Sequence, residues 1–183
     1  MLRQVREDYV AHQCDWSLPG LRALAVHRFG GWSASVRSSW YGWFFERVYK
    51  TLYIHVRNHY HIELPRTTVV GRRLRIGHQG AIVIHPRSSL GDDCVLRQNV
   101  TIGAANEETA DRGPRLMNRV EVGCGAVIVG GVTIGDDVRI GPNAVITMNI
   151  PAGSVVVAAA PRIINLKKAP APSRDAAGVG IET

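Results

Sequence analysis

The feature that most constrains the fold of this chain is a repeat of six residues between positions 70 and 146. Most hexads begin with a branched aliphatic residue followed by glycine, and a second small or apolar residue comes four positions after the aliphatic one. A period of six fits neither the 3.6-residue α-helix nor the two-residue alternation of an ordinary strand. It is typical of a triangular solenoid, in which each hexad forms one flat side and points two side chains inward. The aliphatic positions are Val70, Ile76, Ile84, Leu90, Leu96, Ile102, Leu116, Val122, Ile128, Ile134, Ile140 and Ile146.

Two interruptions of the repeat are the places where we expect chemistry. The step from Ile76 to Ile84 is two residues longer than a hexad, and it carries His78. The segment Ala104–Arg115 (AANEETADRGPR) is polar and lacks a hexad aliphatic, which predicts an extruded loop. Such a loop on a repeat scaffold is more often functional than incidental. Without these insertions, the residues from 70 to 157 supply hexads for roughly four coils.

The whole chain divides into three parts. Residues 1–65 predict an N-terminal α-helical segment, residues 66–163 the solenoid, and residues 164–183 a flexible tail rich in proline, alanine and charge. Within the helical segment, apolar residues at 3–4 spacing predict one amphipathic helix after Pro19. A second helix is expected from about Ser35 to Val56.

An aromatic cluster in the second expected helix, Trp40-Tyr41-Gly42-Trp43-Phe44-Phe45, has two interpretations. The rings could pack on the end of the solenoid or on another subunit. With Arg47, Lys50 and Arg57 interleaved, they also suit peripheral contact with lipid headgroups. The first residues lack the apolar run of a signal peptide, and no run reaches the roughly 18 apolar residues that span a bilayer. We therefore expect a cytoplasmic protein, held at the inner face of the membrane if the lipid interpretation is correct.

The formal charge of +7 is compatible with several partners. The basic residues are dispersed and no RNA- or DNA-binding motif accompanies them, so nucleic acid is not expected. An anionic ligand, such as a nucleotide-bearing cofactor or an acidic glycan, explains the excess equally well. The three cysteines, Cys14, Cys94 and Cys124, lack metal-ligand spacing, which favours a reducing compartment and no metal site.

With its hexads, the longer turn that holds His78 and the loop, the chain resembles the hexapeptide-repeat acyltransferases. Among them it is most similar to the serine O-acetyltransferase family, especially its shorter members found with polysaccharide biosynthesis. The matching segments run from PGLRALAVHRFGGW through IELPRTTVVGRRLRIGHQGAIVIHP and LGDDCVLRQNVTIG to VEVGCGAVIVGGVTIGDDVRIGPNAVI. The resemblance implies a left-handed parallel β-helix, a homotrimer and acetyl-CoA as acyl donor. It also implies active sites between neighbouring subunits, which the extruded loop completes.

His78 matches the catalytic histidine of that family. The two surplus residues of its turn should bulge from a corner of the solenoid and hold the imidazole outside the core. Histidine is the side chain best suited to accept the proton of an acceptor hydroxyl near neutral pH. The freed oxygen would then attack the thioester directly, with backbone N–H groups stabilising the oxyanion. His85, beside Pro86 at the next corner, is interpreted as structural.

The resemblance also nominates residues for the two substrates. Small residues at corners let backbone amides approach the pantetheine arm, and arginine supplies charge for phosphate oxygens. For the acceptor, the matching positions are Asp111 and Arg112 in the loop and Asp15 in the helical segment. The positions nominated for acetyl-CoA are Ala104, Cys124, Gly125, Arg139, Pro142 and Asn143, with further charge from Arg162, Lys167 and Lys168.

Two departures from the family pattern bear on the acceptor. Serine-using members place aspartate directly before the catalytic histidine, where this chain has Gly77. They also carry a second histidine in an Asp-Arg-His-Pro run, and here Gly113 takes its place. A free amino acid needs charged partners for both its ammonium and its carboxylate group. The losses therefore favour a glycan acceptor, a sugar hydroxyl in surface polysaccharide biosynthesis.

Three alternatives stay open. The acceptor could be the small molecule L-serine, which would be acetylated by the same mechanism. The missing second histidine could mark a non-catalytic scaffold protein. A metal enzyme like the β-helical carbonic anhydrases would need three converging histidines, and the solenoid offers only His78 and His85.

Overall fold

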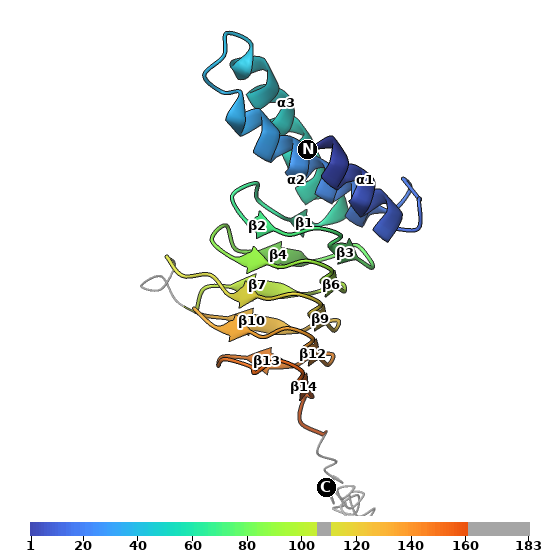
Figure 1. Cartoon of the computed structure of the whole chain (residues 1–183), viewed down its shortest axis with the longest axis vertical. Coiled ribbons are helices and arrows are strands. Elements are labelled where there is room, and N and C mark those ends of the chain that lie inside the picture. Colours follow the sequence, from blue (N-terminus) through green and yellow to red (C-terminus); the bar gives the residue numbers. More distant parts are fainter. Residues whose placement is uncertain (106–110, 161–183) are drawn as a thin grey trace, which may run out of the picture.

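The computed structural model describes residues 1–105 and 111–160, and it shows a helical segment seated on one end of a β-helix (Figure 1). The helices are α1 (Leu2–Ala11), α2 (Pro19–Ser35) and α3 (Gly42–His55), which continues into the π-helix η1 (Val56–Tyr60). The remaining elements are short strands that wind as a left-handed parallel β-helix, as expected. They are β1 (Ile62–Glu63), β2 (Val69–Val70), β3 (Arg75–Ile76), β4 (Ile82–Ile84), β5 (Ser89–Leu90), β6 (Val95–Leu96), β7 (Thr101–Gly103), β8 (Arg115–Leu116), β9 (Glu121–Val122), β10 (Val127–Val129), β11 (Thr133–Ile134), β12 (Arg139–Ile140), β13 (Val145–Ile146) and β14 (Val155–Val156).

Successive strands belong to three different sheets, which form the faces of a triangular prism. Sheet A has the order β1-β4-β7-β10-β13, sheet B the order β11-β8-β5-β2, and sheet C the order β14-β12-β9-β6-β3. Strands β1 to β12 therefore make four complete coils, and β13 and β14 belong to a fifth, incomplete one. The number of coils expected from the hexads is confirmed.

The inward side chains of all three sheets build one core. Ile84 of β4 lies opposite Ile102 of β7, which in turn lies opposite Ile128 of β10, so identical positions stack from coil to coil. Each coil buries its aliphatic residues only against its neighbours, which makes stability a property of the stack. The second inward positions expected from the hexads are all buried: Leu74, Ser88, Cys94, Val100, Ala126, Val132, Val138 and Ala144.

The helical segment is fixed to the first coil by a buried ion pair. Arg28 of α2 donates from Nε to Asp8 Oδ2 of α1 at 3.0 Å, and both side chains are at most 5% exposed. The same guanidinium donates from Nη1 to the carbonyl of Val70 at 2.7 Å. Gly20 lets α2 lie directly on β3, because a Cβ there would be 2.6 Å from the carbonyl oxygen of Ile76. A buried pair with its hydrogen bonds satisfied costs several kcal/mol to break, so the docking angle is well defined.

The structure corrects two boundaries of the expected helical segment. Ile62 of β1 pairs with Ile82 of β4, so the solenoid begins before residue 66. The second expected helix begins at Gly42 rather than near Ser35, because α2 continues to Ser35 and the chain turns in between. The turn is tight: a Cβ on Gly42 would be 2.5 Å from the carbonyl oxygen of Arg37. No helix in the described parts of the chain is long and apolar enough to cross a membrane.

The expected loop is shorter at its C-terminal end than its sequence suggested. Arg115 is the first residue of β8 and pairs with Ser89 of β5. Residues 106–110 of the loop, Arg162, and the expected tail with Lys167 and Lys168 lie outside the described residues.

Candidate active site

The corners of the prism stack into three edges, and each edge has its own chemistry. We call the passage from sheet C to sheet A the His78 edge, the passage from A to B the loop edge, and the passage from B to C the ladder edge. The His78 edge comprises residues 77–81, 97–100, 123–126 and 141–144; the loop edge 85–88, 104–105, 111–114, 130–132 and 147–149; and the ladder edge 71–74, 91–94, 117–120 and 135–138.

His78 lies in the corner between Ile76 and Ile84, a step two residues longer than the step from Leu96 to Ile102 around the corner below it. The backbone N–H of Asn99, in that lower corner, donates to the carbonyl of Gly80 at 2.9 Å, so the surplus residues are displaced outward. Gly80 (φ +113°) and Ala81 (φ +47°) then return the chain to β4. The imidazole of His78 is exposed, as the longer turn predicts.

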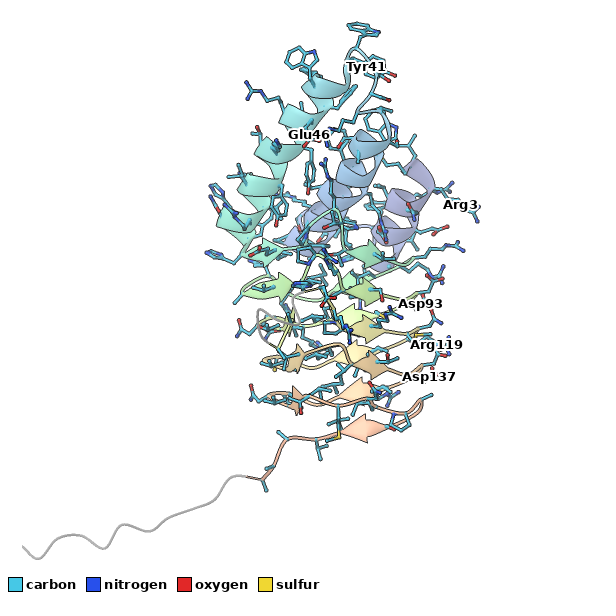
Figure 2. All side chains as sticks on the ribbon, turned by 90° about the vertical axis from the view of Figure 1, so that its left-hand side faces the viewer. Arg3, Tyr41, Glu46, Asp93, Arg119 and Asp137 are labelled. Carbon is cyan, nitrogen blue, oxygen red and sulfur yellow. The ribbon has the colours of Figure 1, made fainter. Side chains whose placement is uncertain are left out.

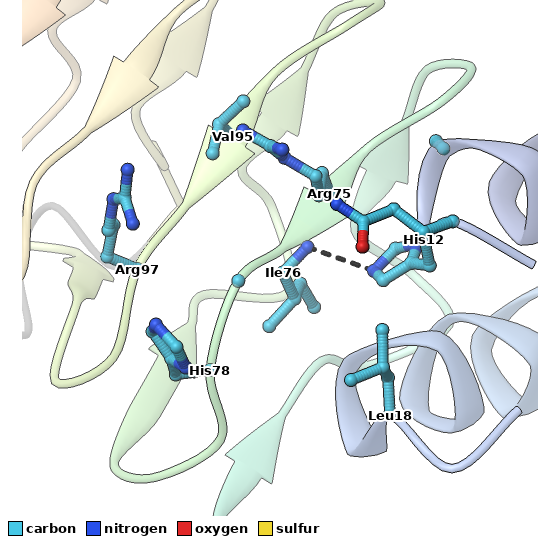
Figure 3. Close-up of a pocket in the computed structure, with 10 residues that line it drawn as sticks. His12, Leu18, Arg75, Ile76, His78, Val95 and Arg97 are labelled. Atoms are coloured by element: carbon cyan, nitrogen blue, oxygen red, sulfur yellow. Dashed lines mark hydrogen bonds between the residues drawn. The ribbon is translucent and has the colours of Figure 1, made fainter. Parts of the chain in front are cut away.

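The imidazole borders a pocket of about 240 Å³ between the solenoid and the helical segment (Figure 3). The solenoid contributes side chains from β3, β6 and the corners that follow them, and the helical segment contributes the end of α1 and the start of α2. The lining residues are Ala11, His12, Gln13, Leu18, Arg75, Ile76, Gly77, His78, Val95 and Arg97.

A second histidine, His12, holds the helical wall of this pocket in place. Its Nε2 accepts a hydrogen bond from the backbone N–H of Ile76 at 3.2 Å. The proton therefore resides on Nδ1, which donates to the carbonyl of Asp8 at 2.8 Å. His12 is 2% exposed, so this neutral imidazole joins the end of α1 to β3 directly beneath the pocket. No sequence pattern had singled it out.

Asp15, nominated for the acceptor, lies in the loop between α1 and α2 that borders the pocket. Both oxygens of its carboxylate accept hydrogen bonds from Ser17: the backbone N–H donates to Oδ1 at 2.7 Å, and Oγ donates to Oδ2 at 2.8 Å. These two hydrogen bonds lower the pKa of the Asp15 carboxyl. The carboxylate thus shapes the loop, and it is not among the side chains that line the pocket.

Most of the residues nominated for acetyl-CoA form one strip with His78. Cys124 and Gly125 lie two coils below it on the same edge, and Pro142 and Asn143 lie three coils below. At about 4.8 Å per coil the strip extends for about 14 Å. Gly125 has φ +69°, and a Cβ there would collide with the side-chain oxygen of Asn143. The absence of a side chain keeps this part of the edge low enough for an extended ligand to approach the backbone.

Arg139 stands beside this strip, on the outer face of sheet C. It lines a second hollow, of about 140 Å³, together with Arg75, Arg97 and Glu121. This hollow continues from the His78 pocket toward the later coils, because Arg75 and Arg97 line both.

Three nominated residues, Ala104, Asp111 and Arg112, lie on the loop edge and not with His78. Arg112 packs against Gly131 on the loop edge: a Cβ added to Gly131 would lie 3.3 Å from the Cβ of Arg112. Its Nε lies 3.9 Å from Asp111 Oδ2. Sheet A separates this edge from the His78 edge, so one chain does not bring these residues to its own catalytic candidate.

Gly113 and Gly77, the two departures from the family pattern, differ in how much space a side chain would have at each position. A Cβ on Gly113 would lie 2.6 Å from the backbone of Arg87 and Ser88, so this backbone does not accept a histidine there. A Cβ on Gly77 would meet only the carbonyl oxygen of Leu96, at 3.7 Å. The chain is therefore built around glycine at 113, whereas an aspartate at 77 would fit.

The site contains two arginines that sequence reasoning did not assign to it, Arg75 and Arg97. A signal for Arg97 was present: it follows the hexad aliphatic Leu96 at the place where Gly77, Gly123 and Gly141 follow theirs. Arg75 is an outward residue of β3, and nothing in its hexad distinguishes it from other exposed positions.

His85 lies on the loop edge and supports the corner that contains it. Its Nδ1 accepts the backbone N–H of Arg87 at 3.2 Å, and its carbonyl accepts that of Ser88 at 3.0 Å. In a single chain it does not share an edge with His78. Among residues 1–105 and 111–160, no group of three histidine, cysteine or acidic side chains is placed to hold a metal ion.

Residues 113–147 match the family model described as bacterial transferase hexapeptide (six repeats). Together with the three-faced solenoid, this match shows the fold: a left-handed β-helix whose hexads are similar to the hexapeptide repeats of bacterial transferases. Proteins similar to this chain include serine acetyltransferases. The one from Helicobacter pylori strain J99 is 41% identical over 103 residues, 56% of this chain and 60% of the relative. The one from Synechococcus elongatus is 32% identical over 147 residues, 80% of this chain and 57% of the relative.

Solved structures agree with the fold. The serine acetyltransferase isoform 3 of Entamoeba histolytica, in complex with cysteine, superposes with a TM-score of 0.72 at 24% identity, covering 90% of this chain and 61% of that one. The Brucella abortus serine acetyltransferase in complex with coenzyme A gives 0.72 at 21% identity, covering 88% and 66%. The left-handed β-helix with an N-terminal helical segment is thereby confirmed. The chain spans 56% to 60% of the length of the first curated relatives.

Proposed function

We propose that this chain is an acetyl-CoA-dependent O-acetyltransferase of the serine acetyltransferase type, with His78 as general base. The observation that carries the proposal is the exposed imidazole in a lengthened corner, at the head of the strip formed by Cys124, Gly125, Pro142 and Asn143. The coenzyme A complex of the Brucella abortus relative supports coenzyme A as the carrier of the acyl group.

The proposed reaction is a direct transfer. His78 takes the proton of the acceptor hydroxyl, and the oxygen attacks the thioester carbonyl. The tetrahedral intermediate collapses with cleavage of the C–S bond, and the departing thiolate takes the proton from the imidazolium. The products are the O-acetyl ester and coenzyme A, so atoms and charge balance without a metal or redox partner.

The names of the relatives favour L-serine as the acceptor over the sugar hydroxyl expected from the two glycines. We therefore place L-serine first. A sugar hydroxyl is the second candidate, because Gly113 leaves no room for the histidine of the serine-using pattern and Gly77 removes its aspartate.

Acetyl-CoA consumption by the purified chain, with L-serine and with a set of neutral and acidic sugars, separates the candidates. Turnover of L-serine that exceeds every sugar would reject the sugar acceptor. Turnover of a sugar without turnover of L-serine would reject the serine acceptor. Equal turnover by wild type and His78→Ala would reject His78 as the general base, and no turnover of any acceptor by the wild type would favour the non-catalytic scaffold.

We also propose a homotrimer in which the loop of one subunit reaches the His78 edge of the next. The support is geometric: Arg112 and Asp111 are separated from His78 of their own chain by sheet A. Co-expression of His78→Ala with Arg112→Ala tests this arrangement, because a mixed trimer would contain sites with both native residues. Activity in the mixture, absent from either variant alone, is the expected result. No recovery in verified mixed trimers would contradict the shared site.

The aromatic cluster lies at the tip of the α2–α3 hairpin, at the far end from the solenoid (Figure 2). Trp40 is 87% and Trp43 67% exposed, so these rings do not pack on the solenoid of their own chain. Exposed Arg37, Arg47 and Lys50 flank them. Aromatic rings beside cationic side chains match the interface of an anionic bilayer. We propose peripheral contact with such a surface.

Sedimentation with phosphatidylglycerol vesicles tests the lipid contact. Binding should weaken with salt and disappear in Trp40→Ala/Trp43→Ala. If the double variant instead halves the mass of the assembly in solution and leaves vesicle binding unchanged, the cluster joins subunits and the lipid proposal is wrong.

A further inference from the structure

The pocket beside His78 is cationic. Two arginines, Arg75 and Arg97, line it, and none of the ten lining residues is aspartate or glutamate. We propose that Arg75 and Arg97 recognise an anionic group, carboxylate or phosphate, on the molecule whose hydroxyl is acetylated. The inference rests on the proposed function, and it specifies the class of acceptor.

The two guanidinium groups enter the pocket from different directions. Arg75 is the outward residue of β3, next to Val95 of β6 in register. Arg97 begins the corner after β6, one coil below Gly77, whose N–H donates to the carbonyl of Leu96 at 2.9 Å. Figure 3 shows His78 and Arg97 following one another along the solenoid wall, opposite His12 and Leu18. An acceptor placed with its hydroxyl at His78 would therefore have a cation within reach on two sides.

Arg75 and Arg97 differ from the arginines that stabilise the fold. Among residues 1–105 and 111–160, neither guanidinium forms an ion pair or a hydrogen bond. The arginines that stabilise the fold are engaged in such contacts: Arg28 with Asp8, Arg66 with Glu46, Arg72 with Glu7, Arg73 with Asp93 and Arg119 with Asp137. Two unpaired cations that face one small pocket repel each other, and an anion between them removes that cost.

Gly77 contributes to this selectivity because it has no side chain. An aspartate there would place a carboxylate between Arg75 and His78, and the space exists for it. Its absence leaves no acidic side chain among the residues that line the His78 pocket; Glu121 lines only the second hollow, where it lies in register with Arg139. The same glycine that departs from the serine-using pattern thus makes the pocket more positive.

The phosphates of acetyl-CoA are the competing partner for these arginines. The thioester must lie at His78 for the reaction to occur, and the phosphates are at the other end of that molecule. An acyl donor that extends along the strip toward Pro142 brings its phosphates to Arg139, three coils away from His78. Arg75 and Arg97 then face the acceptor.

The test compares acceptors that differ in one carboxylate: L-serine with L-serinamide, and D-glucuronate with D-glucose. The variant is Arg75→Gln/Arg97→Gln, and the matched control is Arg3→Gln/Arg6→Gln, which removes two charges from exposed positions of α1 outside the pocket. In each pair that is acetylated, wild type and control should prefer the carboxylate member by about tenfold in kcat/KM, the size of one charge-assisted contact. The pocket variant should lose that preference while its KM for acetyl-CoA changes less than twofold.

Two results would overturn the inference. One is an unchanged preference in Arg75→Gln/Arg97→Gln; the other is a raised KM for acetyl-CoA with an unchanged KM for the acceptor, which assigns the arginines to the donor. If no acceptor is acetylated, the proposed function fails, and ligand-observed NMR still decides the inference. Wild type should then bind D-glucuronate and not D-glucose, and Arg75→Gln/Arg97→Gln should bind neither sugar. Equal signals for both sugars with wild type would reject the inference.

Discussion

The ladder edge and the His78 edge have the same corner geometry, and they use it for different purposes. Each four-residue corner places one residue in the left-handed region, which lets the chain change direction, and the longer corner of His78 places two there, Gly80 and Ala81. On the ladder edge these residues are Arg73, Asp93, Arg119 and Asp137; on the His78 edge they include Asn99, Gly125 and Asn143.

The side chains of the ladder edge form hydrogen bonds from coil to coil, and Figure 2 shows Asp93, Arg119 and Asp137 following one another along this edge. Arg119 donates to Asp137 at 2.6 Å, and Asp92 Oδ1 accepts the backbone N–H of Arg72 at 2.7 Å. The Asp92 N–H donates in turn to Asn118 Oδ1 at 2.9 Å. Because this edge holds the coils together, the His78 edge can leave its side chains exposed for a ligand.

Of the predictions that test this contrast between the two edges, the largest expected effect is the loss of kcat on removal of His78. His78→Ala should lower kcat by about 10²–10⁴, the usual contribution of a general base. The melting temperature should stay unchanged, since the imidazole is exposed and, within the described residues, forms no hydrogen bond. Steady-state kinetics and thermal melts measure both quantities, with the exposed His59→Ala as control. Full turnover by His78→Ala would remove this edge from the chemistry.

Acid should weaken the helical segment before it affects the ladder edge. Burial and the nearby charge of Arg28 together lower the pKa of His27 in α2 from 6.5 to about 4. The unfolded chain therefore binds the proton first, and stability falls as the pH falls from 6.5 to 4. The total loss is about 3 kcal/mol, at 1.36 kcal/mol per pKa unit.

Urea unfolding at pH 7 and pH 4.5 measures this loss, and His27→Gln should reduce it. Arg73 and Arg119 lower the pKa values of the carboxyl groups of Asp93 and Asp137 on the ladder edge. The stabilisation that these carboxylates provide is therefore lost only below about pH 4. An equal acid sensitivity in His27→Gln would show that another group is responsible.

The hexads predicted the solenoid and its core because each aliphatic position contacts its equivalent one coil away. The same regularity made the longer corner visible, and with it His78. The helical wall of the pocket was not predictable in this way: His12 meets Ile76 only because Arg28 and Asp8 set how α1 and α2 dock. The proposed approach of Arg112 to His78 of a neighbouring subunit was not predictable from the hexads either, because no pattern within one chain describes a contact between chains.

The same substitution in the two edges should have unequal effects on stability. A Cβ on Gly91, on the ladder edge, would lie 2.6 Å from the carbonyl oxygen of Met117, whereas on Gly77 it meets nothing closer than 3.7 Å. We expect Gly91→Ala to cost about 1–3 kcal/mol, as overpacking does, and Gly77→Ala to stay within about 0.5 kcal/mol. Urea denaturation gives both values, and both variants lose similar unfolded-state freedom. Equal losses would contradict the assignment of close packing to the ladder edge.

The smallest expected effect comes from the ion pairs of the ladder edge. Arg119 and Asp137 are 54% and 56% exposed, and exposed pairs contribute little. The hydrogen bond from Arg119 lowers the pKa of Asp137, so the pair stabilises the fold at neutral pH and ceases to do so as acid protonates the carboxylate. Arg119→Gln should lower the melting temperature by about 1–2 °C at pH 7 and low salt, and by less in 1 M NaCl or below pH 3. A decrease as large as that of Gly91→Ala would mean that charge, rather than close backbone packing, holds the ladder edge together.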